Sequence, residues 1–175
     1  LQRHEFEALV LAALDALATL LDTSDRAGIA ALQALLLHSA PEEVNDGDMY
    51  MVNDPYMGAL HQNDVAVVSP LYWGGEIVLW AGNVLHHTDV GGIDEGSFCV
   101  NATNVHQEPP RYFLKLVDRG KFSREVERTF MLNSRYPDLV ALDLRAQVGG
   151  LNVVKRRLSE LIEEKGVDVV LEVMQ

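Results

Sequence analysis

Apolar residues in the first part of the chain follow a helical pattern. Between Glu5 and Leu37 they recur at three- and four-residue steps, the spacing of one face of an α-helix. Thr23-Ser24-Asp25 interrupts this pattern with good capping residues, so we predict two helices, the second from about Arg26 to His38. Both are so rich in leucine and alanine that we expect them to be buried or to form an interface.

The middle of the chain changes to the residue types of β-strands. Three segments combine β-branched and aromatic residues between glycine, proline, asparagine and aspartate: Asp48–Val52, Val65–Tyr72 and Glu76–Val84. Gly74-Gly75 separates the last two, which predicts a hairpin. A shorter extended segment, Tyr112–Val117, precedes a turn at Asp118-Arg119-Gly120. Because Val65–Val68 is apolar on both faces, we expect a sheet that is covered on both sides.

The last part of the chain is helical and amphipathic. Ser123 is placed to cap a helix that runs to about Leu132. Pro137 fits the first position of a long helix that we predict to reach Glu164, with Gly149-Gly150 inside it as a kink or a point of close packing. Gly166 then ends this helix, and a further helix covers Val167–Met174.

Together these elements predict an α+β fold, with an antiparallel or mixed sheet, flanking helices, and helical segments at both ends. We expect a single domain over residues 1–175: residues 1–40 helical, residues 47–117 β-rich and carrying the candidate site, and residues 123–175 helical. Because the first residue is Leu1 and lies next to a predicted helix, we expect this chain to be a piece of a longer protein.

Charge and composition exclude several classes of partner. The chain has 14 Lys+Arg against 26 Asp+Glu, a formal charge of −12, so nucleic-acid phosphate is not an expected partner. Asp15 and Asp22 interrupt the richest apolar stretch, so we expect no membrane-spanning segment. The single Cys99 excludes an internal disulfide and a four-cysteine zinc site, and it favours a reducing, cytoplasmic location.

Candidate chemistry begins with the pair His61 and Asp64. Residues three apart on a regular strand face opposite sides, so both side chains can reach one metal ion only from a turn. Asn63, Gly58 and Pro55 supply turn-forming residues around them. Imidazole and carboxylate suit zinc, manganese or ferrous iron. On its own the pair is better explained by a surface histidine and an aspartate that begins a strand.

A second histidine cluster strengthens the metal hypothesis. His86-His87 follows the third β-segment, and the hairpin turn brings the end of that segment beside Asp64. Neighbouring strand residues point to opposite faces, so one of the two histidines joins His61 and Asp64, and the other supports the site or contacts substrate. The competing interpretation is a pair of histidines that bond only to backbone carbonyls.

Three carboxylates in the loops are further candidates for contact with substrate. Asp54 precedes Pro55, which holds it in an extended or turn geometry. Asp89 precedes Gly91-Gly92, where backbone can approach a ligand closely. Glu108, before Pro109-Pro110, is a candidate acid/base on a rigid loop. Each is also explained as an ordinary turn or surface residue.

Four spaced motifs resemble the hydantoinase B/oxoprolinase family. They are Gly47-Asp48-Met49-Tyr50-Met51-Val52-Asn53-Asp54-Pro55-Tyr56, His61-x-x-Asp64-Val65, His86-His87-x-Asp89-Val90-Gly91-Gly92 and Asp143-Leu144-Arg145-Ala146-Gln147. The similarity runs from about Gly47 to Glu164. It implies a B-type subunit, or half, of an ATP-dependent hydantoinase or 5-oxoprolinase, or the corresponding subunit of an acetone or acetophenone carboxylase. Subunits of this type are several hundred residues long, so the chain would be part of one.

The resemblance also implies a division of labour. An A-type partner subunit uses ATP to phosphorylate a substrate oxygen, and the B-type subunit acts on the activated small molecule in a hetero-oligomer. In the carboxylase branch a divalent metal is held by a His-x-x-Asp pair and a later histidine, which match His61, Asp64 and His86. His87, Asp89, Asp54 and Glu108 are then expected near substrate.

Three functions follow as hypotheses. The first is an ATP-dependent hydrolase subunit that opens a cyclic amide. The second keeps the site but makes the chain a ketone carboxylase subunit, since Gly58-Ala59-Leu60-His61 departs from the hydantoinases' Gly-Gly-Thr-His toward the carboxylases. The third is a truncated, non-catalytic scaffold, favoured by the leucine-rich helices near the start of the chain.

Overall fold

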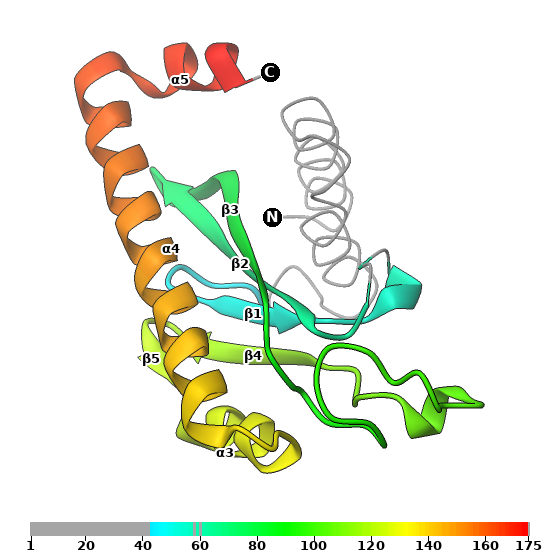
Figure 1. The fold of residues 1–175 in the computed structure, drawn as a ribbon. Coiled ribbons are helices and arrows are strands. Elements are labelled where there is room, and N and C mark those ends of the chain that lie inside the picture. Colours follow the sequence, from blue (N-terminus) through cyan, green and yellow to red (C-terminus); the bar gives the residue numbers. More distant parts are fainter. Residues whose placement is uncertain (1–42, 58, 60, 175) are drawn as a thin grey trace.

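The computed structural model describes residues 43–57, 59 and 61–174. The two helices predicted before His38 lie outside these residues. The described part contains a five-stranded antiparallel sheet and three α-helices, so the predicted α+β class is confirmed (Figure 1). Of the two sheet types that the sequence allowed, the antiparallel one is present.

The sheet has the strand order β3-β2-β1-β4-β5. Its strands are β1 (Met49–Val52), β2 (Asp64–Trp73), β3 (Glu76–His86), β4 (Phe113–Asp118) and β5 (Lys121–Phe122). β2 and β3 form the predicted hairpin around Gly74-Gly75, where both glycines have positive φ. The two-residue strand β5 follows the predicted turn and is too short to leave an alternating pattern in the sequence.

The helices follow the sheet in the chain. α3 (Arg124–Asn133) begins at Ser123, whose hydroxyl accepts a hydrogen bond from the Val126 backbone N–H. α4 (Pro137–Lys165) has Pro137 at its start and continues through Gly149-Gly150, and α5 (Val167–Met174) follows Gly166. Short 3₁₀ turns, η3 (Pro55–Met57) and η4 (Val105–Gln107), lie in the loops.

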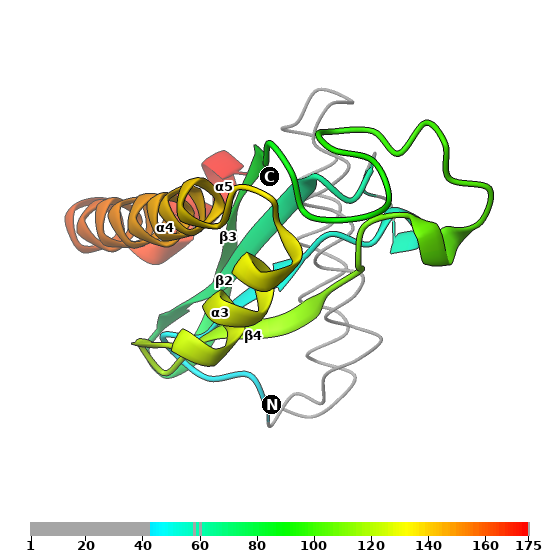
Figure 2. The same cartoon turned by 60° about the horizontal axis from the view of Figure 1, so that its bottom comes forward.

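α4 packs against β2 and β3, and α3 packs against β4 and α4 (Figures 1 and 2). The core between these layers joins Met51, Val65 and Leu116 of the sheet to Phe130 of α3 and Leu144 of α4. The first eight residues of β2 are buried, as expected for a strand that is apolar on both faces.

The buried carboxylate of Asp48 fixes the start of β1. Its oxygens accept hydrogen bonds from Lys115 Nζ at 2.8 Å and from the Arg119 and Asn45 backbone N–H groups at 2.8 and 2.9 Å. These bonds tie β1 to β4 and to the turn that follows β4. Within the described residues, no helix is both long enough and apolar enough to cross a membrane.

Candidate metal centre

His61 and Asp64 share one short turn at the entrance of β2. The Asp64 backbone N–H donates to the His61 carbonyl at 3.1 Å, and the Asn63 N–H donates to His61 Nδ1 at 3.3 Å. The turn lets two residues three apart face one another, with 3.5 Å between His61 Nε2 and Asp64 Oδ2. This is the turn geometry that the sequence predicted for the pair.

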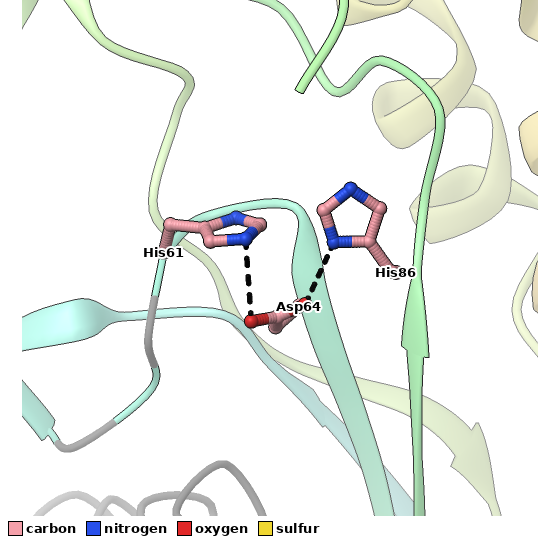
Figure 3. A group of neighbouring side chains, drawn as sticks. All are labelled: His61, Asp64 and His86. Atoms are coloured by element: carbon pink, nitrogen blue, oxygen red, sulfur yellow. Dashed lines mark hydrogen bonds and ion pairs between the residues drawn. The ribbon is translucent and has the colours of Figure 1, made fainter. Parts of the chain in front are cut away.

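The hairpin supplies the third side chain. Asp64 is paired with His86 in the β2–β3 register, and His86 Nδ1 lies 2.9 Å from Asp64 Oδ1 (Figure 3). The two imidazole rings meet edge to face, with 4.7 Å between their centroids. The structure therefore brings His61, Asp64 and His86 together, and His86 is the member of the His86-His87 pair that joins the cluster.

The local environment favours neutral histidine at position 61. Burial lowers the pKa of His61, Asp64 opposes this effect, and His86 adds to it, leaving the pKa below its ordinary value of 6.5. A neutral ring keeps a lone pair free for a metal ion, whereas a protonated ring repels one.

The donor set fits a divalent transition metal. His61, Asp64 and His86 each offer a ligand atom, and these atoms all lie within 4.8 Å of one another. Two imidazoles and one carboxylate suit zinc, manganese or ferrous iron, and they leave further positions for water or substrate. The side chain of Asp64 is 12% exposed and that of His86 is 46% exposed, so the cluster is reachable from one side.

The loop after β3 adds two contacts that the sequence analysis missed. Ser97 Oγ lies 2.8 Å from His86 Nε2, and the Phe98 ring lies 5.0 Å from the His61 ring, centroid to centroid. Gly96 has a positive φ and marks the turn just before them, but no pattern in this loop indicated contact with the histidines.

Asp64, His86 and Ser97 form a hydrogen-bonded series in the order of a carboxylate, a base and a nucleophile. A serine-based site is therefore a competing chemical interpretation of the same contacts. It gives no role to His61, which is held 3.5 Å from the same carboxylate. The metal interpretation accounts for all three members of the cluster.

His87 lies away from the cluster, in the core. Its side chain is fully buried, its Nε2 is 3.0 Å from Gln147 Oε1, and its ring packs edge to face on Phe130. Burial lowers the pKa of His87, and the hydrogen bond that its ring donates to Gln147 acts in the opposite direction. Contact of His87 with substrate stays a prediction; these side-chain contacts are to the helical layer.

Asp89 is also fully buried and is held by structural contacts. Its carboxylate accepts from Arg135 Nη1 at 2.8 Å and from the backbone N–H groups of Gly91, Gly96 and Arg135 at 3.0 to 3.2 Å. Burial raises the pKa of Asp89, but these bonds outweigh it and hold the pKa below the ordinary value. The carboxylate therefore joins the loop after β3 to the connection between α3 and α4.

Asp54 and Glu108 line one cavity of about 500 Å³, together with His106, Arg111 and residues around them. Arg111 Nη1 lies 3.4 Å from both oxygens of Asp54. Glu108 Oε2 accepts from Gln62 Nε2 at 2.5 Å, and Gln62 is the chain neighbour of His61. The structure thus places these two predicted residues together, next to the turn that carries the metal candidates.

The fold and the site define a class: an α+β protein with two histidines and one carboxylate at the open end of a β-hairpin. The family model for hydantoinase B/oxoprolinase matches residues 11–175. The chain therefore belongs to this family, as the four sequence motifs indicated.

Several known relatives are similar over most of the chain. The acetophenone carboxylase delta subunit of Aromatoleum aromaticum is 31% identical over 140 residues, covering 77% of this chain and 20% of the relative. The caprolactamase subunit beta of Pseudomonas jessenii is 34% identical over 134 residues, covering 74% and 22%. The crystal structure of the ATP-dependent caprolactamase from P. jessenii superposes with a TM-score of 0.78 at 29% identity, over 85% of this chain and 26% of that one. The chain spans between 10% and 23% of the length of eight curated relatives that it matches.

Proposed function

We propose that this chain is the metal-binding part of a B-type subunit in an ATP-dependent cyclic amide hydrolase of the hydantoinase/5-oxoprolinase type. The single observation that carries the proposal is the convergence of His61, Asp64 and His86 at one end of the β2–β3 hairpin. Family membership supports the reaction class. The similar caprolactamase subunit also belongs to an enzyme whose name describes hydrolysis of a cyclic amide.

In this proposal His61, Asp64 and His86 hold a divalent metal, either zinc, manganese or iron. When bound, such a metal lowers the pKa of water or stabilises an oxyanion. Asp54 and Glu108 line the adjoining cavity and act on substrate there, Glu108 as the acid/base. His87 and Asp89 keep the surrounding strand end and loop in place, and a direct role for them at the substrate is the weaker alternative.

Activity in this proposal needs a partner. ATP is used by a hydantoinase A-type subunit, which phosphorylates a substrate oxygen, and the activated small molecule is then processed beside the metal. The names of the relatives as delta and beta subunits support a hetero-oligomer. The cavity beside Glu108 is the proposed place for the substrate.

A ketone carboxylase subunit is the second candidate function. The specific observation in its favour is the 31% identity to the acetophenone carboxylase delta subunit. The same cluster would then steady an enolate that attacks carbon dioxide or its carboxy-phosphate equivalent. The third candidate, a non-catalytic scaffold, keeps the fold and predicts a chain that folds without binding metal.

Metal analysis of the purified chain tests the common element of the two enzyme hypotheses. We expect a stoichiometric divalent metal that is lost in His61→Ala while folding is retained. Folded, metal-free wild-type protein would instead favour the scaffold. ATP turnover with an A-type partner then separates the reactions: hydantoin or 5-oxoproline stimulates a hydrolase, and a ketone with bicarbonate stimulates a carboxylase. Absence of turnover with both substrate classes rejects both enzymes.

A further inference from the structure

Gln147 is a polar residue at a core position. Val140, Leu144, Gln147 and Leu151 recur at helical spacing and form the buried stripe of α4 that faces the sheet. The three apolar members are completely buried, and Gln147 is 5% exposed. An amide in such a place is costly unless its donors and acceptor are hydrogen-bonded, so its partners show what it does there.

The amide of Gln147 bonds to both strands of the β2–β3 hairpin. Its Nε2 donates to the Val65 carbonyl at 2.8 Å and to Asn83 Oδ1 at 3.0 Å. Its Oε1 accepts from His87 Nε2 at 3.0 Å. Since the Val65 carbonyl can only accept, the amide orientation is fixed, and with it the proton on His87 Nε2.

Two of these three partners, Val65 and His87, are chain neighbours of candidate metal ligands. Val65 follows Asp64 on β2, and His87 follows His86 at the end of β3. Successive side chains of a strand point to opposite faces. The Gln147 amide therefore holds Val65 and His87 from the helical face of the hairpin. The residues just before them, Asp64 and His86, present their side chains on the opposite face.

Asn63 also fixes His87, through hydrogen bonds to the His87 backbone. The Asn63 carbonyl accepts from the His87 N–H at 2.8 Å, and Asn63 Nδ2 donates to the His87 carbonyl at 2.8 Å. His87 is thus fixed through its backbone by Asn63 and through its ring by Gln147. Its other ring nitrogen, Nδ1, is buried and has no hydrogen-bond partner among the described residues, so within this part of the chain the Gln147 contact alone orients the ring by hydrogen bonding.

We infer that Gln147 is a positioning residue for the metal centre, which sets the separation of Asp64 and His86 by clamping Val65 and His87. This inference rests on the proposed metal-binding function. It assigns a role to Gln147 of the Asp143–Gln147 motif, which lies on α4. Within the part of the chain that the structure describes, Gln147 makes no hydrogen bond to any of the three candidate ligands.

Mn²⁺ binding by the complete 175-residue chain tests the inference. Gln147→Met keeps the side-chain length and removes every hydrogen bond of the amide. We expect its Kd for Mn²⁺, measured from the EPR signal of the free ion, to rise about 10-fold or more, the loss typical when partners that support a metal ligand are removed. A wild-type Kd in folded Gln147→Met protein overturns the inference and leaves the proposed function standing.

Leu151→Ala is the matched control for loss of stability. Leu151 lies one turn further along the same buried stripe and makes no bond to the hairpin ends, so its truncation loosens the α4 packing without removing the clamp. We expect its Kd to stay within about twofold of wild type. An equal weakening of Mn²⁺ binding in Leu151→Ala overturns the inference, because general destabilisation then explains the effect.

A metal-free readout separates this inference from the function it rests on. In the amide NMR spectrum without metal, the Asp64 and His86 signals should shift in Gln147→Met and stay in place in Leu151→Ala. Unchanged signals in Gln147→Met overturn the inference whatever the metal result. Wild-type protein that binds no Mn²⁺ contradicts the proposed function, and the metal-free shifts then decide the positioning role by themselves.

Asn83→Ala provides the same test if Gln147→Met does not fold. Asn83 is only partly buried, and its loss removes one acceptor of Gln147 Nε2 and the bond from Asn83 Nδ2 to the Gln147 carbonyl. We expect weaker Mn²⁺ binding than in Asn152→Ala, an exposed amide on the same helix. Equal Kd values in these two variants overturn the inference.

Discussion

Asp64 and His86 face one another across the β2–β3 hairpin, 22 positions apart in sequence, with 2.9 Å between Asp64 Oδ1 and His86 Nδ1. His61 completes the cluster from the turn just before β2. Because the Asp64 carboxylate approaches both rings, one with each oxygen, it is the central member of the site.

The first prediction concerns this carboxylate. Asp64→Asn keeps the size of the side chain but removes its negative charge, so we expect loss of stoichiometric metal, with a Kd raised more than about 100-fold. Metal content after dialysis and a metal titration measure the effect. Glu76→Gln, an exposed carboxylate at the other end of the hairpin, is the control. Full metal occupancy in Asp64→Asn would contradict the assignment.

The second prediction separates metal chemistry from a serine nucleophile. Ser97 contacts His86 Nε2, so Ser97→Ala should change the rate of the reconstituted enzyme by no more than about 10-fold if the metal does the chemistry. A nucleophilic serine would instead cost about 10⁴-fold or more in kcat. Measuring kcat and metal content together distinguishes the two, and a loss of kcat on the larger scale with full metal content would favour the serine interpretation.

The third prediction addresses the buried carboxylate of Asp89. Asp89→Asn weakens the bonds to Arg135 and to the loop N–H groups, so we expect a loss of about 2 kcal/mol in the free energy of unfolding. The expected loss is small because the Arg135 side chain is 37% exposed and solvent screens its charge from Asp89. Urea unfolding measures it. Unchanged stability would show that Asp89 is free for another role.

The fourth prediction is a pH dependence of stability centred on Asp48. Burial raises its pKa, but bonds from Lys115, Arg119 and Asn45 outweigh this, so the folded-state pKa lies below the ordinary value of 3.8. The unfolded chain then binds a proton at higher pH than the folded chain. The stabilisation is therefore complete above the unfolded pKa and is lost as the pH falls through the folded one.

Thermal unfolding between pH 7 and pH 3 checks this dependence. We expect Asp48→Asn to have a lower Tm than wild type at pH 7, by the equivalent of about 2 kcal/mol, and the two Tm values to approach one another toward pH 3. Glu163→Gln, an exposed carboxylate on α4, is the control and should follow the wild-type curve. A constant difference across the whole range would exclude Asp48 as the titrating group.

Much of this architecture was predictable because it depends on local pattern. Alternation, glycine pairs and capping residues gave the hairpin, the Ser123 cap and the long helix from Pro137, and the hairpin in turn placed Asp64 beside His86. The choice of His86 over His87 was not predictable, because it depends on which face of the sheet the helices cover. The contact of Ser97 with His86 depends on the path of an irregular loop.

Gln147 shows a different limit of sequence reasoning. Its position in the apolar stripe of α4 is visible in the sequence, but its partners on β2 and β3 lie more than 60 positions away. Helical spacing identifies Gln147 as a polar residue at an apolar position. Only the tertiary packing shows which strand residues it bonds to.

The pairing of β2 with β3 makes this site sensitive to length changes. The cluster is at the open end of the hairpin, at the Asp64–His86 pair, while the turn at Gly74-Gly75 is at the other end. If one residue were deleted from β2 or β3 and no bulge absorbed the change, every pair between the deletion and the open end would shift by one place. Asp64 would then face Leu85 or His87 instead of His86. The irregularity between Leu71 and Tyr72 is on the turn side of the site, so homologues that gain or lose a residue should do so there and keep the remainder of the ladder intact.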